Sequence, residues 1–584
     1  MALSRNAESR FAVNPTHLDI SRSRFDRTST VKTSFNVGDL VPFYIDEVLP
    51  GDTFDVSTAK VVRMQPMVAP PMDDLFLDTY YFFVPNRLVW EHWQNLMGEN
   101  DTTSWYPSVD YSVPQILSPS HGWNIGTIAD YFGIPTGVDN LSVSALPFRC
   151  YAKIVNDWFR DENLVDPAVL TTGDATSFGS NDGGLSSYEL GGKPFVAAKY
   201  HDYFTSCLPS PQKGEPVTVP LGNVTVPVDV PVKTTDNIVS PSANDIGMIV
   251  QNAPMVNSEN GYFTYKGATG MSFRTEVDVD PLLKTADDAL VPVNLRAIGN
   301  AVGSTSVVTI NELRMAFQMQ KLLERDARGG TRYIEMIKSH FGVTSPDARL
   351  QRSEYLGGNR IRINVNQIVQ QSATTTGSTP QGNPVGLSVT HDNSDSFTRS
   401  FTEHGFVIGL MVARYPHTYQ QGIERFWSRK SRFDYYFPVF ANIGEQAVLN
   451  KEIYATGTAD DDKAFGYQEA WADYRYKPSR VSGEMRSAAT KSLDVWHFAD
   501  YYNKLPTLSP DWIKEDKNNV DRVLAVSSKV SNQLWADIVI NNRTSRPMPL
   551  YSVPVQQTNH EHFEHIARTK QNYEQRRRKY HLYP

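Results

Sequence analysis

Three histidines near the C-terminal end of the chain are the first residues whose types could support chemistry. His560, His562 and His565 lie together in HEHFEH, and clustered imidazoles can bind a transition metal. Their i, i+2, i+5 spacing suits neither one face of a helix nor a familiar zinc pattern. We therefore interpret them as solvated side chains and not as ligands.

A run of three carboxylates, Asp460 to Asp462 in ADDDK, offers the oxygen ligands that divalent cations prefer. The three side chains point in different directions and follow no EF-hand spacing, so we interpret the run as a solvated loop. The sequence also lacks G-x-S-x-G, the P-loop, the Rossmann fingerprint and H-E-x-x-H. It therefore predicts a protein that is not an enzyme and that holds no metal and no cofactor.

Charge is concentrated at the two ends of the chain. Residues 1–34 hold six basic and three acidic residues, and residues 566–584 hold six basic residues and one acidic residue. The net charge of the whole chain is −8, so the body between these ends is strongly acidic. Two basic ends on an acidic body indicate that the ends meet a polyanion or an acidic partner.

The C-terminal stretch NYEQRRRKYHLYP combines cations with aromatic rings. Arginine and lysine neutralise phosphates, and rings can stack on unpaired bases. The alternative interpretation is an ordinary charged tail on a surface helix. We favour contact with single-stranded DNA, and the candidate residues are Arg576, Arg577, Arg578, Lys579 and Tyr580.

A strand is expected where DTYYFFVPNRLVWEHWQNLMGE begins, because Leu77 to Val84 is apolar on both faces. Pro85 ends the strand, since it has no N–H to donate. A short helix is expected next, with Asn86 as N-cap and with Val89, Trp93, Leu96 and Met97 on one face. Trp90 lies off that face. It packs either within its own subunit or across a subunit contact, and we name it a candidate subunit contact.

The 584-residue chain divides into five parts by composition. They are an extended basic arm at 1–34, the first part of a β-rich core at 35–214, a β-rich insertion at 215–308, the rest of the core at 309–565, and a basic tail at 566–584. Strands are expected in the last core part at NRIRINVNQIVQQ, HGFVIGLMVARY and RKSRFDYYFPVF. No apolar run is long enough to span a membrane, so no membrane insertion is expected. The two cysteines, Cys150 and Cys207, are expected to be buried thiols.

Several long blocks resemble one family, the major capsid proteins of the Microviridae, and within it the gokushovirus branch. The blocks are the stretch from Asp78 to Glu99, LPFRCYAKIVNDWFRDENL, HDYFTSCLPSPQKG, INELRMAFQMQKLLERDARGGTRYIEMIKSHFGVTSPDARLQRSEYLGG and FGYQEAWADYRYKPSRVSGEMR. The resemblance covers nearly the whole chain, except that residues 215–308 match by position more than by sequence.

The resemblance implies an eight-stranded viral jelly roll with long loop insertions, and a T=1 icosahedral shell of sixty copies. It implies a virion assembled in the bacterial cytoplasm around packaged single-stranded DNA. The implied partners are further copies of the chain, an internal scaffolding protein, a pilot protein and a small basic DNA-binding protein. It also implies a protrusion at the three-fold axes, which residues 215–308 would form and which would meet a host surface receptor.

Two other functions fit the sequence less well. A secreted jelly-roll carbohydrate-binding protein or glycosidase would need a secretion signal and a carboxylate pair in a groove, and the sequence shows neither. A dedicated single-stranded nucleic-acid-binding protein would be expected to have a basic body, whereas this body is acidic. The sequence therefore predicts a structural capsid protein.

Overall fold

The computed structural model describes residues 22–99, 109–215, 310–369 and 382–551, the single residues 217 and 371, and the backbone of five short strands between residues 232 and 297. The chain forms two compact units, one made of residues 1–214 and 323–584 and the other of residues 215–322. Among the described residues, no helix is both long and apolar enough to cross a membrane.

Eight strands of the first unit pair in a nested order, so that the first strand pairs with the last. The pairs are β1 (Ser23–Phe35) with β19 (Leu534–Arg546), β2 (Val41–Val48) with β16 (Gly405–Arg414), β3 (Thr53–Met64) with β15 (Pro384–Ser400), and β4 (Phe76–Pro85) with β13 (Glu354–Arg362). All four pairs are antiparallel, as in a long hairpin that has been rolled up.

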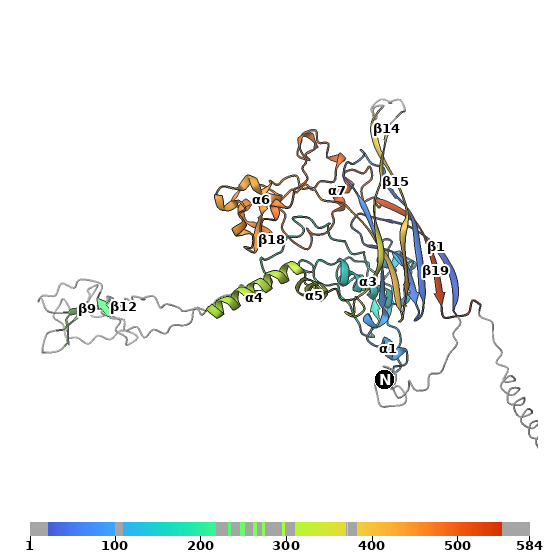
Figure 1. Ribbon diagram of the computed structural model, residues 1–584, viewed down its shortest axis with the longest axis horizontal. Helices are drawn as coiled ribbons and strands as arrows, with labels where there is room; N and C mark the ends of the chain where they lie inside the picture. The colour runs from blue at the N-terminus through green and yellow to red at the C-terminus, as the bar shows by residue number, and fades with distance from the viewer. Residues whose placement is uncertain are drawn as a thin grey trace, which may run out of the picture. The chain divides into compact units, whose positions relative to one another are not determined.

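The rolled hairpin closes into two sheets because β3 also pairs with β19 and β4 also pairs with β16. One sheet has the order β1-β19-β3-β15-β14, where β14 (Val365–Val369) is an added edge strand, and the other has the order β13-β4-β16-β2. Figure 1 shows the strands of these sheets running side by side. This order is that of a double-sheet jelly roll, and the predicted fold class is confirmed.

The space between the two sheets is filled by alternate residues of each strand. Val56 of β3 and Ile538 of β19 meet Tyr81 and Phe83 of β4 in one hydrophobic core. Because side chains of a strand alternate between its two faces, the intervening residues of β3 and β19 face outward and are largely exposed. The alternation in these strands therefore fixes which face of the sheet is inside.

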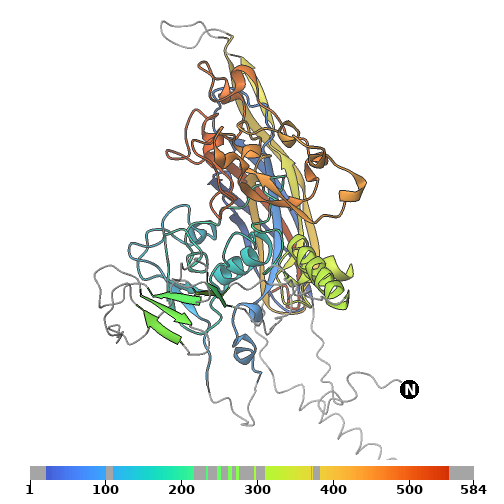
Figure 2. The same cartoon turned by 90° about the vertical axis from the view of Figure 1, so that its left-hand side faces the viewer.

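The β13-β4-β16-β2 sheet is covered on its other face as well. Phe82 and Leu410 belong to a second core with side chains of α3 (Leu146–Ile154). The sequence prediction that the Leu77–Val84 strand is covered on both sides agrees with this arrangement. Figure 2 shows the segment that holds α3 beside the barrel strands. Burying a large apolar side chain contributes about 1.5–3 kcal/mol, so this second core anchors the long insertion between β4 and β13.

The segment after β4, which contains Trp90, differs from the helix that the sequence predicts. In place of a continuous helix, the chain makes a 3-10 turn, η1 (Asn86–Leu88), and a single helical turn, α1 (Trp93–Leu96). The carbonyl oxygen of Asn86 accepts hydrogen bonds from the N–H groups of Val89 and Trp90, at 3.1 and 3.0 Å. This tight turn directs Trp90 into the second core, where it is fully buried and its Nε1–H donates to Asp174 at 2.7 Å. Trp90 therefore packs within its own subunit, which is the first of the two alternatives that the sequence left open.

The N-terminal boundary also differs from the prediction. Residues 23–34 were assigned to an extended arm, but they belong to β1, which pairs with β19 from Ser23↔Arg546 to Phe35↔Leu534. β1 is an edge strand, and edge strands are commonly kept polar or charged so that they do not recruit further strands. That polar composition gives β1 no hydrophobic pattern from which a strand could be predicted.

The remaining elements are short and lie in the long connections. In the first unit they include β5 (Gln115–Leu117), α2 (Ile128–Tyr131), β6 (Ser142–Ser144), β7 (Ser177–Phe178), α5 (Tyr333–Phe341), β17 (Glu445–Leu449), α6 (Asn450–Ile453), β18 (Ala464–Glu469) and α7 (Lys517–Asp521). The described strands of the second unit are β8 (Val232–Thr234), β9 (Ile246–Val250), β10 (Gly261–Tyr265), β11 (Met271–Arg274) and β12 (Leu295–Ala297), all paired antiparallel. Helix α4 (Ile310–Gly329) begins in the second unit and ends in the first.

A buried lysine inside the barrel offers a test of this packing. Lys60 of β3 places its Nζ 2.8 Å from Asp392 and 2.9 Å from Asp395, and its side chain is 1% exposed. Lys60→Met leaves both carboxylates without their cation, and we expect the free energy of unfolding to fall by about 3–5 kcal/mol. The control is Lys32→Met on β1, whose side chain is 77% exposed and whose loss should change stability by under about 0.5 kcal/mol. Chemical denaturation measures both, and equal effects would contradict the assignment.

Candidate functional site

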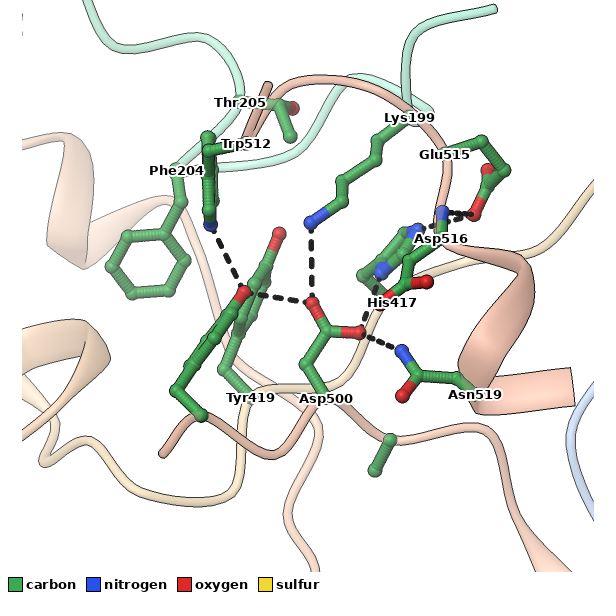
Figure 3. Close-up of polar contacts among 12 residues, drawn as sticks. Lys199, Phe204, Thr205, His417, Tyr419, Asp500, Trp512, Glu515, Asp516 and Asn519 are labelled. Carbon is green, nitrogen blue, oxygen red and sulfur yellow. Dashed lines mark hydrogen bonds and ion pairs between the residues drawn. The ribbon is translucent and has the colours of Figure 1, made fainter. Parts of the chain in front are cut away.

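A buried carboxylate joins four segments of the loops at one end of the barrel. Asp500 accepts hydrogen bonds from His417 Nδ1 at 2.9 Å, Asn519 Nδ2 at 2.6 Å and the Tyr502 hydroxyl at 2.8 Å, and it pairs with Lys199 Nζ at 3.3 Å (Figure 3). The nearby charges and hydrogen bonds outweigh the effect of burial and lower the pKa of Asp500. The carboxylate therefore stays ionised and holds the four segments together.

His417 connects this carboxylate to a second one. Its Nε2 lies 2.8 Å from Glu515, and its ring packs on Tyr415 with 4.4 Å between the ring centroids. Burial alone would lower the pKa of His417, but the charges of Asp500 and Glu515 raise it to about 9. The imidazole is therefore protonated at neutral pH and donates to both carboxylates.

A His–Asp pair can act as a general base, but this pair is placed for structure. Both ring nitrogens of His417 are already hydrogen-bonded, and its side chain is buried with those of Asp500 and Glu515. No nitrogen is left to take a proton from a substrate, and a general base must lie within hydrogen-bond reach of one. We name these residues, together with Lys199 and Asn519, the ionic cluster.

Aromatic side chains continue the ionic cluster outward. Trp512 donates its Nε1–H to the Tyr502 hydroxyl at 3.0 Å, and Lys199 Nζ lies 4.6 Å from the centroid of the Trp512 ring. Trp512 in turn packs on a small third core that includes Phe204, Tyr419 and Phe465. The loops at this end are therefore a packed layer with a core of their own, which can present a surface in one fixed shape.

The segment from 425 to 443 carries many large apolar side chains that are exposed on this layer. Trp427 is 71% exposed and Val439 is 88% exposed. We name the whole set the aromatic surface. It consists of Phe426, Trp427, Phe433, Tyr435, Tyr436, Phe437, Val439, Ile443 and Tyr474. Contiguous exposed apolar patches are uncommon on monomeric proteins and mark interaction sites.

The prediction of a strand at RKSRFDYYFPVF is wrong. The chain there forms 3-10 turns, η6 (Arg432–Asp434) and η7 (Pro438–Phe440), preceded by η5 (Arg425–Ser428). The Asp434 carboxylate accepts the N–H groups of Lys430 and Ser431, at 2.8 and 2.7 Å, and so stabilises a turn in place of a strand. Because turns project side chains in several directions, one sheet face cannot bury these rings, and they stay exposed.

Two cations at the aromatic surface are paired within the chain. Arg429 forms an ion pair with Asp473, and its guanidinium lies 4.3 Å from the centroid of the Tyr474 ring. Lys477 pairs with Glu424 and lies over the Phe426 ring. Internal pairing lowers the electrostatic penalty when a partner excludes water from this surface. Aromatic residues with arginine are the composition typical of the centre of protein–protein interfaces.

A groove of about 600 Å³ adjoins the aromatic surface. Trp427, Tyr474 and Arg480 line it, together with Tyr203 and Glu452 of the layer beneath. Residues that dominate binding usually insert into such pockets near the centre of an interface. The groove therefore gives the aromatic surface a place for an anchoring side chain of a partner.

The other residues singled out from the sequence form no reactive site within the described part of the chain. Asp461 accepts the backbone N–H groups of Thr456 and Gly457, and Asp460 and Asp462 pair with lysines. No group of three or more His, Cys, Asp or Glu among the described residues could hold a metal. Cys150 and Cys207 are buried free thiols, and burial raises the pKa of each.

Some of the predicted site residues lie outside the described part of the chain. The three clustered histidines, at 560, 562 and 565, and the candidate DNA contacts Arg576, Arg577, Arg578, Lys579 and Tyr580 lie outside the described residues. Their roles stay predictions. The ionic cluster and the aromatic surface, in contrast, were not foreseen as sites, although the Trp, Tyr, Phe and Arg content of residues 425–443 was a signal for the second.

Comparison with known proteins identifies relatives along nearly the whole chain. The family described as "Capsid protein (F protein)" matches residues 14–556. "Capsid protein VP1" of Spiroplasma virus 4 is 44% identical over 546 residues, which cover 92% of this chain and 95% of that protein. "Capsid protein VP1" of Bdellovibrio phage phiMH2K is 42% identical over 94% of this chain and 98% of its own length, and that of Chlamydia phage 1 is 41% identical over 94% and 97%.

The raised pKa of His417 should make the stability of the protein depend on pH. An ordinary histidine has a pKa of 6.5, whereas His417 has a pKa of about 9 in the folded chain. Between these two pH values the folded state therefore keeps a proton that the unfolded state releases. The free energy of unfolding should be at its full value below about pH 6 and should fall by up to ~1.4 kcal/mol per pH unit as the pH rises toward 9. Denaturant titrations at a series of pH values measure this slope.

The matched variants are His417→Gln and His391→Gln. The first should remove most of the slope, because no imidazole is left to bind the proton. The second changes an exposed histidine of β15 and should leave the slope as it is. A His417→Gln protein with an unaltered slope would show that the ionic cluster does not control the pH response.

Proposed function

The chain belongs to the capsid protein (F protein) family, and from this premise we propose that its copies associate through the aromatic surface into the closed shell of a small single-stranded DNA phage. The matches confirm the resemblance to the major capsid proteins of the Microviridae. The chain is accordingly a structural protein of a virion and not an enzyme. The observation that carries the proposed contact is the exposure of the aromatic surface on a packed layer.

The shell that we propose is a T=1 icosahedron of sixty copies. A contact between two different patches closes into a ring when the rotation between copies fits, and otherwise it grows into a filament. A rigid layer favours closure because it holds the angle of the contact constant. The ionic cluster supports this rigidity, since Asp500 alone fixes Lys199, His417, Tyr502 and Asn519.

Packaged single-stranded DNA is the polyanion that we propose for the two basic ends. Ser23 pairs with Arg546, so the two ends of the barrel chain leave the same sheet side by side. The tail contacts would be Arg576, Arg577, Arg578, Lys579 and Tyr580. A small basic DNA-binding protein would assist them inside the shell.

Further partners follow from family membership as proposals. During assembly in the bacterial cytoplasm the chain would meet an internal scaffolding protein and a pilot protein. Residues 215–308 would form the protrusion that meets a host surface receptor. Support for this segment as a separate part comes from the compact unit of residues 215–322 and its short antiparallel strands.

Trp427→Ser tests the proposed contact. Its side chain is mostly exposed, so the soluble protein should keep its thermal unfolding midpoint, while shell yield should collapse. An interface residue of this kind typically contributes about 2 kcal/mol or more, which weakens each contact by roughly 30-fold. Electron microscopy and sedimentation of the protein, co-expressed with its scaffold, measure assembly.

Val530→Ser is the control for this variant. Val530 is a lone apolar residue that is even more exposed and lies outside the aromatic surface, so its loss should leave shell yield intact. Normal shells from Trp427→Ser would exclude the aromatic surface as a subunit contact. Loss of shells from both variants would mean that exposed apolar side chains matter in general and not at this surface.

Replacing Arg576, Arg577, Arg578 and Lys579 with alanine tests the DNA contact. For single strands, the slope of log affinity against log salt is about −0.7 per neutralised phosphate, so the slope should become shallower by about 3. Salt titration of single-stranded DNA binding to disassembled protein measures it. Lys504→Ala with Lys529→Ala, two exposed lysines of the loops, should leave the slope unchanged, and an unchanged slope in the tail variant would remove the tail as a DNA contact.

A further inference from the structure

Strand β14 is the free edge of the five-stranded sheet. It pairs with β15 from Val365↔Ser388 to Val369↔Pro384 and ends the order β1-β19-β3-β15-β14. The β14–β15 hairpin extends beyond the barrel in both views (Figures 1 and 2). The outer side of β14 therefore presents the unpaired backbone N–H and C=O groups that every edge strand has.

The two edges of this sheet differ in charge. β1 at the opposite edge carries Arg24, Asp26, Arg27 and Lys32, and charges on an edge strand discourage pairing with another chain. β14 has the sequence VNQIV, without charge or proline. β14 therefore lacks the charges that protect β1 from pairing with another chain.

Apolar side chains on β14 are exposed as well. Ile368 is 48% and Val369 is 43% exposed, and Leu387 of β15, beside Asn366, is 43% exposed. Over residues 384–388, β15 pairs with β14 on one side and has only the isolated bridge Met67↔Gly386 on the other. A hairpin of two strands alone is marginal in water. A third strand beside β14 would satisfy its backbone groups and cover part of these side chains.

The sequence of β14 is suited to pairing with itself. In an antiparallel pair centred on Gln367, Val365 faces Val369 of the partner subunit and Asn366 faces Ile368 of the partner subunit. Gln367 faces its own counterpart, and two amides can hydrogen-bond. No like charges meet across the two-fold axis, where they would oppose pairing. The same patch on both copies makes the contact isologous.

We propose that β14 pairs antiparallel with β14 of a second copy across a two-fold axis, so that the five-stranded sheets of two barrels form one continuous sheet. This inference rests on the proposed function, because it adds a second contact to the shell. A closed shell of many copies needs at least two kinds of contact, since an isologous contact alone stops at a dimer. The aromatic surface and β14 lie on different elements of the chain.

Cysteine cross-linking tests both the partner and the register. In the proposed pair the two Cβ atoms at position 367 are about 5 Å apart, close to the reach of a disulfide. Gln367→Cys should therefore form disulfide-linked dimers in shells under mild oxidation, seen on non-reducing gels. Asn366→Cys is the matched control, because it faces position 368 and not itself. The native cysteines are buried and should stay silent.

Mixed assembly sharpens the test. Shells that contain both Asn366→Cys and Ile368→Cys chains should cross-link, although each variant alone should do so several-fold less. Equal cross-linking of Gln367→Cys and Asn366→Cys would overturn the register. Intact shells without any Gln367→Cys dimer, or with Gln367→Cys linked to a protein other than this chain, would overturn the β14 pair and leave the proposed function standing.

The same experiment separately shows whether the proposed function itself is wrong. If the unmodified chain forms no shells with its scaffold, the proposed function fails before any cysteine is introduced. The thermal unfolding midpoint of soluble Gln367→Cys should match that of the unmodified chain, since position 367 is exposed. Under that condition, loss of shells in Gln367→Cys that reduction restores supports the contact at β14.

Discussion

Pairing between the first and last strands is the constraint on which the rest of this structure depends. β1 and β19 are joined over their full length although they lie at opposite ends of the described chain. The three inner pairs are nested within this one, so each long connection leaves from and returns to a fixed position on the barrel. Sequence-distant pairing of this kind is slow to form, but once formed it turns the barrel into a rigid frame for large insertions.

The insertions then acquire order of their own in two different ways. The connection between β4 and β13 packs α3 on the outer face of a sheet and relies on apolar burial. The connection between β16 and β19 has a small apolar core of its own and adds buried polar contacts, with Asp500 and His417 at their centre. Buried ion pairs contribute little net stability but penalise alternative arrangements strongly, because a displaced partner leaves a buried charge unpaired. A surface that must bind other copies of the chain in one geometry is helped by this penalty on alternative arrangements.

The strand at Leu77–Val84 follows from its apolar residues, and the jelly roll follows from the family resemblance. β1 was not predicted, because an edge strand has one neighbour and can be polar. The burial of Trp90 could not be decided from the sequence, because a tight turn and a helix differ by a rotation that periodicity does not report. The rings after Arg429 looked like a strand because composition does not distinguish a buried sheet from an exposed turn. The ionic cluster could not be predicted, since His417 bonds residues 83 and 98 positions away.

The register of β1 with β19 has a mechanical consequence. Ser23 lies opposite Arg546, so tension that pulls the two chain ends apart acts at one end of an antiparallel ladder. The hydrogen bonds of such a ladder run perpendicular to the strands. Under this tension the hydrogen-bonded pairs would therefore break one after another and would not have to break all at once. A load applied from within the shell would peel the edge strand first and leave β3, β15 and the opposite sheet closed.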